Sequence, residues 1–415
     1  MRALVPLALP LTAALCLGAC KQHDGDEPDD TGPGDTDTTD TDPTLARWTV
    51  MVWMDGDNDL ESWVFHDLNE LEQAGSGDGV EIVVQADRAV GYSDNDGDWT
   101  DTRRYHIVED DDMTSVASEL VEEVGEVDMG SPQALSEFLL WANERYPAER
   151  VALVFWDHGT GWMLGEPVPG VAWDEESGTE LTFADGALQS GLQPLEDTRG
   201  GPIDLIGFDA CNMAAWEVAH VLKEHALAMA ASEATVGMGG FQYDLSFATL
   251  RDEPTWGPAE LAADLAQQAV EVGGEWTFSA TDLGQVDPLS QAIDELAVAV
   301  LDDDALLQPL LDARDEAEGT DPHYPRWYID LGSLGQALVA SPEPILAERG
   351  QALLDALDPA VIGAWGSYPY GWSSGLNIFF DPSWAQHLQA YHNGVGATWA
   401  QDTHWDDLLV HISRR

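Results

Sequence analysis

The stretch PIDLIGFDACNMA, from Pro202 to Ala214, decides the fold. It begins with a continuous apolar run and ends in a polar turn that holds Cys211. A second stretch, VALVFWDHG from Val151 to Gly159, has the same pattern of an apolar run followed by polar residues. Short apolar runs without alternation are typical of strands that are covered on both faces. The two stretches therefore predict two buried strands of one parallel sheet, each followed by a polar loop.

Further apolar runs and helical patterns extend this sheet along the chain. Strands are predicted at 47–54, 80–87, 103–109 and 226–232, and helices at 131–146, 181–192 and 212–224. Strands that alternate with helices indicate an α/β domain with a mostly parallel sheet and helices on both faces. From about residue 258 the sequence is mainly helical, and a late strand at 374–380 returns to the sheet or to a small subdomain. Because no repeat or second linker is found, residues 45–415 are predicted to form one domain with a helix-rich C-terminal elaboration.

The first 44 residues read as a leader and a tether. Arg2 and the apolar stretch 3–15, which is short for a membrane span, indicate an export signal. The tetrapeptide LGAC at 17–20 resembles a bacterial lipoprotein processing site, so residues 1–19 are predicted to be a signal peptide and Cys20 to carry lipid. An ordinary cleaved signal peptide is the alternative. Residues 20–44, rich in Asp and poor in apolar side chains, are predicted to be a disordered acidic tether.

This leader places the folded part in the bacterial cell envelope, attached to the outer membrane or cell surface through the lipid on Cys20. The formal net charge is −61, from 16 Lys+Arg against 77 Asp+Glu. Such a surface repels phosphates, so nucleic acid is excluded as a partner. Basic substrates, divalent cations and a salty habitat remain open explanations of the acidity, and the sequence does not decide the oligomeric state.

Cys211 is the only cysteine after the leader, and it is either a small buried hydrophobe or a working thiol. Sites in open parallel sheets form beyond the carboxyl ends of the strands, so His158 and Cys211 would face one crevice if their strands are neighbours. An imidazole beside a thiol can take its proton during nucleophilic attack. The backbone N–H groups of Gly159 and Cys211 would form an oxyanion site. The helix predicted at 212–224 would also lower the thiol pKa.

An apolar strand followed by His-Gly, and another followed by Asp-x-Cys, resembles the caspase-related cysteine peptidases and, most closely, the clostripain family. Further segments of the chain are similar to that family: WMDGDNDLE (53–61), SATDL (279–283), YIDLG (328–332) and GLNIFF (375–380). The resemblance covers most of 48–415. It implies a caspase-like fold and an endopeptidase that acts on a protein or peptide substrate with a Cys/His dyad alone. Cys211 would be the nucleophile, and His158 the general base and then the general acid.

The resemblance also implies a specificity. Asp209 matches the family's acid in the substrate pocket, which implies cleavage after Arg or Lys by charge pairing; a cap on the following helix is the alternative role for Asp209. The family often has a further acid where this chain has GMGG (237–240). Family members also cut themselves after a basic residue between His and Cys, and Arg199 is the only basic residue from Thr160 to Ala210.

No metal ligands are predicted. A structural zinc site needs four N or S ligands, and the folded part has one cysteine. The loops DGDND (55–59) and DNDGD (94–98) lack the glycine and acid positions of an EF-hand, so solvated loops are favoured and calcium stays open as a cofactor. A second class of function also remains: a catalytically inactive peptidase-like surface module that binds protein or calcium through acidic loops.

Overall fold

The computed structural model describes residues 45–163, 170–319, 326–381 and 385–415, the side chains of 385–388 excepted. The described part lies within one compact unit that begins at Pro43. The predicted signal peptide, the lipid site at Cys20 and the acidic tether lie outside the described residues. No helix among the described residues is both long and apolar enough to cross a bilayer.

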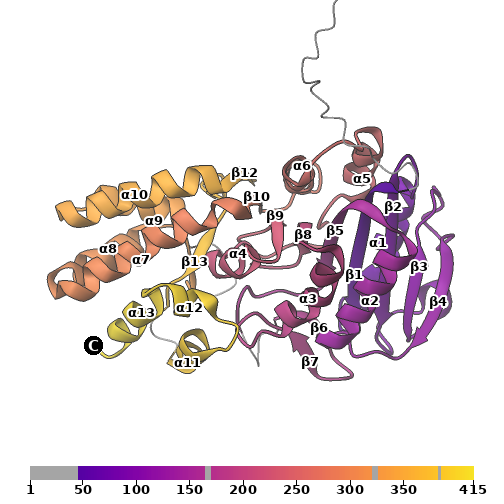
Figure 1. Ribbon diagram of the computed structural model, residues 1–415, viewed down its shortest axis with the longest axis horizontal. Coiled ribbons are helices and arrows are strands. Elements are labelled where there is room, and N and C mark those ends of the chain that lie inside the picture. The colour runs from indigo at the N-terminus through magenta and orange to yellow at the C-terminus, as the bar shows by residue number, and fades with distance from the viewer. Residues whose placement is uncertain (1–44, 164–169, 320–325, 382–384) are drawn as a thin grey trace, which may run out of the picture. The chain divides into compact units, whose positions relative to one another are not determined.

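A nine-stranded sheet in the order β12-β10-β9-β8-β5-β1-β2-β3-β4 forms the centre of the unit (Figure 1). The five central strands, β9, β8, β5, β1 and β2, pair in parallel, and two antiparallel strands flank them on each side. The strands span Ala46–Gly56 (β1), Val80–Arg88 (β2), Thr102–His106 (β3), Glu119–Gly125 (β4), Ala148–Trp156 (β5), Ile203–Asp209 (β8), Ala226–Ala231 (β9), Thr277–Asp282 (β10) and Val361–Gly366 (β12). The predicted mostly parallel sheet is confirmed.

Two small antiparallel sheets accompany the large one. Strand β6 (Val171–Asp174) pairs with β7 (Thr179–Leu181), and β11 (Tyr328–Asp330) pairs with β13 (Asn377–Phe379). The late strand therefore belongs to a small sheet and not to the central one, which decides between the two predicted alternatives.

Thirteen α-helices are present among the described residues. They are α1 (Glu61–Ala74), α2 (Pro132–Arg145), α3 (Ala187–Arg199), α4 (Trp216–Leu222), α5 (Tyr243–Asp252), α6 (Pro258–Glu271), α7 (Val286–Asp302), α8 (Leu307–Glu316), α9 (Leu331–Val339), α10 (Pro344–Ala360), α11 (Ala385–Asn393), α12 (Thr398–Asp402) and α13 (Trp405–Ser413). Short 3-10 turns occur at Asn95–Gly97, Leu283–Gln285 and Asp304–Leu306. Helices α7 to α10 gather at the side of the sheet away from β3 and β4 (Figure 1).

The central strands are apolar on both faces because helices cover both. Val50 and Val52 of β1 belong to a core that includes Leu68 of α1 and Leu265 of α6, whereas neighbouring β1 side chains face the other core. That second core contains side chains of α2, α3, α4 and the C-terminal helices. Burial of both strand faces is the physical reason for the continuous apolar runs.

Two predicted helices begin later than their patterns suggested. The helix predicted at 181–192 begins only at Ala187, because Leu181 ends strand β7. The helix predicted at 212–224 begins only at Trp216, after a turn at Asn212 and an extended Ala215. Both errors come from short, buried turn segments that precede the helices, which periodicity alone does not distinguish from the first turn of a helix.

Candidate active site

The strands that carry His158 and Cys211 are neighbours in the sheet. Strand β5 pairs in parallel with β8, and Trp156 lies opposite Asp209 at the last pair of the register. His158 and Cys211 each follow that pair by two residues, and both line one cleft of about 280 Å³. The same cleft reaches down to Asp209 and is bounded by the start of α1 and by the loop 235–240. The structure thus brings the three predicted site residues together.

Cys211 lies in a turn that follows β8 and not at a helix N-terminus. The Asn212 N–H donates to the Ala234 carbonyl at 3.0 Å, and the Ala214 N–H donates to the Ser232 carbonyl at 2.9 Å. The Val236 N–H lies 3.3 Å from the Cys211 Sγ and donates to it. The prediction that a helix begins directly after Cys211 is therefore wrong, since α4 starts five residues later, at Trp216. The half-buried sulfur instead lies beside the backbone N–H of Val236.

Gly159 allows the two loops to touch. A Cβ atom at this position would lie 2.5 Å from the Cys211 carbonyl oxygen and 3.0 Å from the Cys211 nitrogen. Any side chain would therefore push the two backbones apart. Gly159 keeps the backbone of the loop after β5 in contact with the backbone of the loop after β8. An oxyanion site made of one N–H from each loop requires this closeness.

An acid that sequence reasoning missed contacts the histidine. The Asp59 Oδ1 lies 2.8 Å from the His158 Nε2, and the Asp59 side chain is largely exposed. The preceding Asn58 donates through Nδ2 to the Asp157 Oδ1 at 2.8 Å, which ties the loop after β1 to the loop after β5. The sequence feature that could have indicated this contact is the motif DGDND, because it lies at the end of β1, which neighbours β5 in the sheet.

Asp209 forms the floor of the cleft. Its Oδ2 accepts hydrogen bonds from the Phe241 N–H at 3.1 Å and from the Tyr243 hydroxyl at 2.8 Å. These partners exclude the alternative role as a cap of α4. Burial, followed by repulsion from the Asp67 carboxylate, raises the pKa of the Asp209 carboxyl to about 8. Among the ion pairs of the described residues, none contains Asp209.

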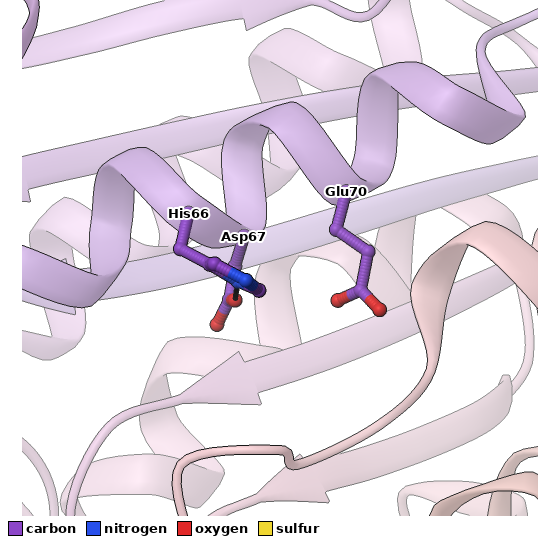
Figure 2. A group of neighbouring side chains, drawn as sticks. All are labelled: His66, Asp67 and Glu70. Atoms are coloured by element: carbon purple, nitrogen blue, oxygen red, sulfur yellow. Dashed lines mark hydrogen bonds and ion pairs between the residues drawn. The ribbon is translucent and has the colours of Figure 1, made fainter. Parts of the chain in front are cut away.

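Helix α1 adds two further acids near that floor, which the sequence did not predict. Figure 2 shows His66, Asp67 and Glu70 projecting from the same side of α1. Asp67 lines the cleft, accepts from the Trp156 Nε1 at 2.5 Å and lies 2.8 Å from the His66 Nδ1. Burial, together with repulsion from Asp67, raises the pKa of Glu70 to about 9. Several buried acids therefore gather near Asp209.

The Gly-rich loop shapes the cleft through its backbone. The Gly237 N–H donates to Glu275 at 2.6 Å, and the Gly240 N–H donates to the same carboxylate at 3.1 Å. Gly240 has a φ of +46°, and a Cβ there would lie 2.3 Å from the Asp209 Oδ1. The loop 237–240 needs glycines because its backbone surrounds the Glu275 carboxylate and lies in contact with Asp209.

Arg199 occupies the last position of α3, away from the residues that line the cleft. Its guanidinium donates to the Asn143 Oδ1 at 3.2 Å and to the Glu149 carbonyl at 3.0 Å. The one basic residue between His158 and Cys211 is thus part of the packing between α2, α3 and β5.

Comparisons with known proteins agree with this architecture. A family model described as the clostripain family, Peptidase C11, matches residues 52–411. Clostripain from Hathewaya histolytica is 26% identical over 294 residues, which make up 60% of this chain and 56% of clostripain. The matched part of the chain thus spans about half the length of that relative.

Two solved structures share the fold. One is an inactive zymogen C11 protease from Parabacteroides distasonis, with 19% identity, coverage of 87% of this chain and 99% of the other, and a TM-score of 0.62. The other is a secreted C11 cysteine protease from Bacteroides thetaiotaomicron in complex with an irreversible peptide inhibitor, with 18% identity, coverage of 85% and 99%, and a TM-score of 0.62. Together with a family model that spans nearly all of the described residues, they confirm the resemblance expected from the sequence. The chain belongs to the clostripain family of cysteine peptidases.

Proposed function

We propose that this protein is a cysteine endopeptidase that cleaves after Arg or Lys, with Cys211 as nucleophile and His158 as general base and acid. The observation that carries the proposal is one cleft that is lined by His158, Cys211 and the buried Asp209. Selective peptide cleavage requires a nucleophile, a base and a charged pocket in one cleft.

The contacts of the imidazole suggest how the proton moves. Asp59 holds the His158 Nε2, so Nδ1 is the nitrogen that would take the thiol proton. The sulfur then bonds to the substrate carbonyl carbon, and the oxyanion is stabilised by the N–H groups of Gly159 and Cys211. The C–N bond breaks as the imidazolium gives its proton to the leaving amine. Water, deprotonated by His158, hydrolyses the thioester and restores the thiol.

The acidic floor supports basic specificity. Asp209 and Glu70 are buried, and neither has an ion-pair partner among the described residues. Isolated carboxylates are costly to bury in charged form, and an ammonium or guanidinium group in the cleft would supply the missing counter-charge. Asp67 and Glu70 on α1 would take the place of the second acid that GMGG replaces.

A peptide library tests this proposal. We expect the purified chain to cleave peptides after Arg and Lys, and iodoacetamide to react rapidly with Cys211 at neutral pH and to stop cleavage. Cleavage that ignores the residue before the scissile bond would contradict the basic specificity. A chain that cleaves no peptide and whose Cys211 does not react would contradict the enzyme and favour the binding module.

We also propose that the enzyme is exported and anchored by lipid on Cys20. The support is the LGAC processing pattern after a short apolar stretch. We expect that, when the full chain is expressed in a bacterial host, labelled palmitate is incorporated into it and the protein sediments with membranes. Cys20→Ser should remove both the label and the sedimentation, whereas Cys16→Ser, inside the leader, should keep both. Label that persists in Cys20→Ser would refute the anchor.

A further inference from the structure

Three side chains that can bind a metal meet where α11 packs against α13 (Figure 1). His392 lies in the last turn of α11, and Asp406 and Asp407 lie in the first turn of α13. One ring nitrogen of the histidine and one oxygen of each aspartate all lie within 4.8 Å of one another. The His392 Nδ1 contacts the Asp406 Oδ2 directly. These three residues are called the His392 cluster below.

Asp406 provides an independent sign of a missing ligand. Its side chain is only 2% exposed, and its Oδ1 has no hydrogen-bond partner among the described residues. Nearly all buried polar atoms of folded proteins have a partner, because an unsatisfied one has lost its hydration without compensation. A cation bound at this oxygen would supply the missing partner.

The two aspartates also lack a permanent counter-charge. In the part of the chain that the structure describes, Asp406 forms an ion pair with His392 and none with Lys or Arg, and Asp407 forms none. A histidine changes its charge near neutral pH, so it neutralises a carboxylate only in part of the pH range. His404 also lies near both aspartates, but its Nδ1 lies 2.7 Å from the Asp294 Oδ1. The His392 cluster therefore has room for a positive charge.

We propose that the His392 cluster binds one zinc ion through a ring nitrogen of His392 and carboxylate oxygens of Asp406 and Asp407. Imidazole nitrogen suits zinc, whereas magnesium prefers oxygen ligands alone. Zinc bonds of about 2.0–2.2 Å place tetrahedral ligand atoms about 3.4 Å apart. Because His392 and Asp407 are exposed, rotation of their side chains can bring the ligands to that spacing. Three protein ligands leave a position for water, so the site differs from a structural zinc site with four N or S ligands.

The group drawn in Figure 2 is a weaker candidate for zinc. His66, Asp67 and Glu70 also offer one nitrogen and two oxygens within 4.8 Å of one another. However, both oxygens of Asp67 already accept hydrogen bonds, from the Trp156 Nε1 at 2.5 Å and from the His66 Nδ1 at 2.8 Å. A metal would have to displace these donors, whereas Asp406 has an oxygen without a partner among the described residues.

Zinc at the His392 cluster would join α11 to α13 close to a contact with the loop after β5. Tyr391, which precedes His392, is fully buried, and its ring centroid lies 4.7 Å from that of Trp162. Trp162 follows His158 by four residues. The site would thus hold α11 where it packs against this loop. A ligand that binds only the folded chain stabilises it, so zinc should raise the Tm.

Calorimetric titration with zinc chloride tests the site. The titrated protein is the chelator-treated Cys211→Ala full chain with its leader thiols alkylated, because thiolates also bind zinc. Excess magnesium chloride occupies groups of carboxylates that lack a nitrogen ligand. We expect one saturable equivalent, and a rise in Tm of about 5 °C at a zinc concentration of about 100 times Kd. Weak binding without saturation and without a change in Tm would overturn the site. Manganese chloride that binds as tightly as zinc would overturn the choice of metal.

Two histidines of the C-terminal helices give a matched pair of variants in the same background. His392→Ala should weaken zinc binding at least tenfold and abolish the rise in Tm. His411→Ala should keep both, although it also loses a contact with a carboxylate, that of Asp304 at 3.0 Å. Equal effects of the two variants would refute the site. Asp407→Asn should weaken zinc binding too, and in chelator it should unfold at the temperature of its parent. If His392 and Asp406 form only an ion pair, Asp407→Asn will bind zinc as its parent does, and the proposal is wrong.

Discussion

Replacement of Cys211 by alanine reduces peptide cleavage by at least about 10⁴-fold, to the detection limit of the assay. Loss of a catalytic nucleophile elsewhere costs up to about 10⁶ in kcat, because the covalent path disappears altogether. The fold should survive, since Cys211 is half-buried and its surrounding segment is held by backbone hydrogen bonds of Asn212 and Ala214. The measurement is kcat/KM for an arginyl peptide, with the Tm recorded for both proteins.

Two further variants make this result specific. Cleavage by His158→Ala should fall by a similar factor, because this variant lacks the imidazole that we propose as the base for the thiol proton. Val272→Ala, an exposed position after α6 and outside the cleft, should keep the wild-type rate. An unchanged rate in Cys211→Ala at an unchanged Tm would remove the cysteine peptidase and leave the surface module as the explanation of the fold.

The parallel strands at the centre of the sheet could be predicted because each one is marked by an apolar run in its own sequence. Strands covered on both faces are mainly apolar, and this shows in the six residues 151–156 of β5 and the four residues 205–208 of β8. The positions of His158 and Cys211 follow, since parallel neighbours end at the same edge. Strand β4, by contrast, was missed. Its sequence ELVEEVG is mainly exposed at the edge of the sheet, so it carries no apolar run.

The acids around the cleft could not be predicted because they depend on the packing of distant segments. Asp67 and Glu70 are buried by contacts with Trp156 and with residues near Asp209, about a hundred positions or more away. In the sequence of α1 they look like ordinary solvent-facing charges of a polar helix. Asp59 is similar: its contact with His158 joins residues 99 positions apart. Charge alone does not indicate burial, since partners that force a carboxylate into a core are set by topology.

Asp209→Asn should lower kcat/KM for arginyl and lysyl peptides by about 100-fold. Truncating one partner of a buried charge pair costs about 3 kcal/mol, and each 1.4 kcal/mol is tenfold. The asparagine oxygen can still accept from the Phe241 N–H and the Tyr243 hydroxyl, so the cleft should keep its shape. The measurement compares kcat/KM for peptides that differ only in having Arg, Lys or Gln before the scissile bond. Only the first two should lose rate.

The pH dependence separates loss of charge from loss of structure in this variant. The pKa of Asp209 is raised to about 8, so the anion that attracts a cation becomes populated as the pH rises from about 7 to about 9. A lysine ammonium stays charged across this range, since its pKa is about 10.4. KM for basic peptides should therefore fall with rising pH in the wild type and fall much less in Asp209→Asn, where Glu70, with a pKa of about 9, is the remaining acid that titrates in this range. Asp197→Asn removes the same charge at an exposed position of α3 and should show the wild-type dependence of KM on pH. If the wild-type KM is flat while Asp209→Asn loses rate on every peptide alike, the carboxylate supports the cleft without selecting the substrate.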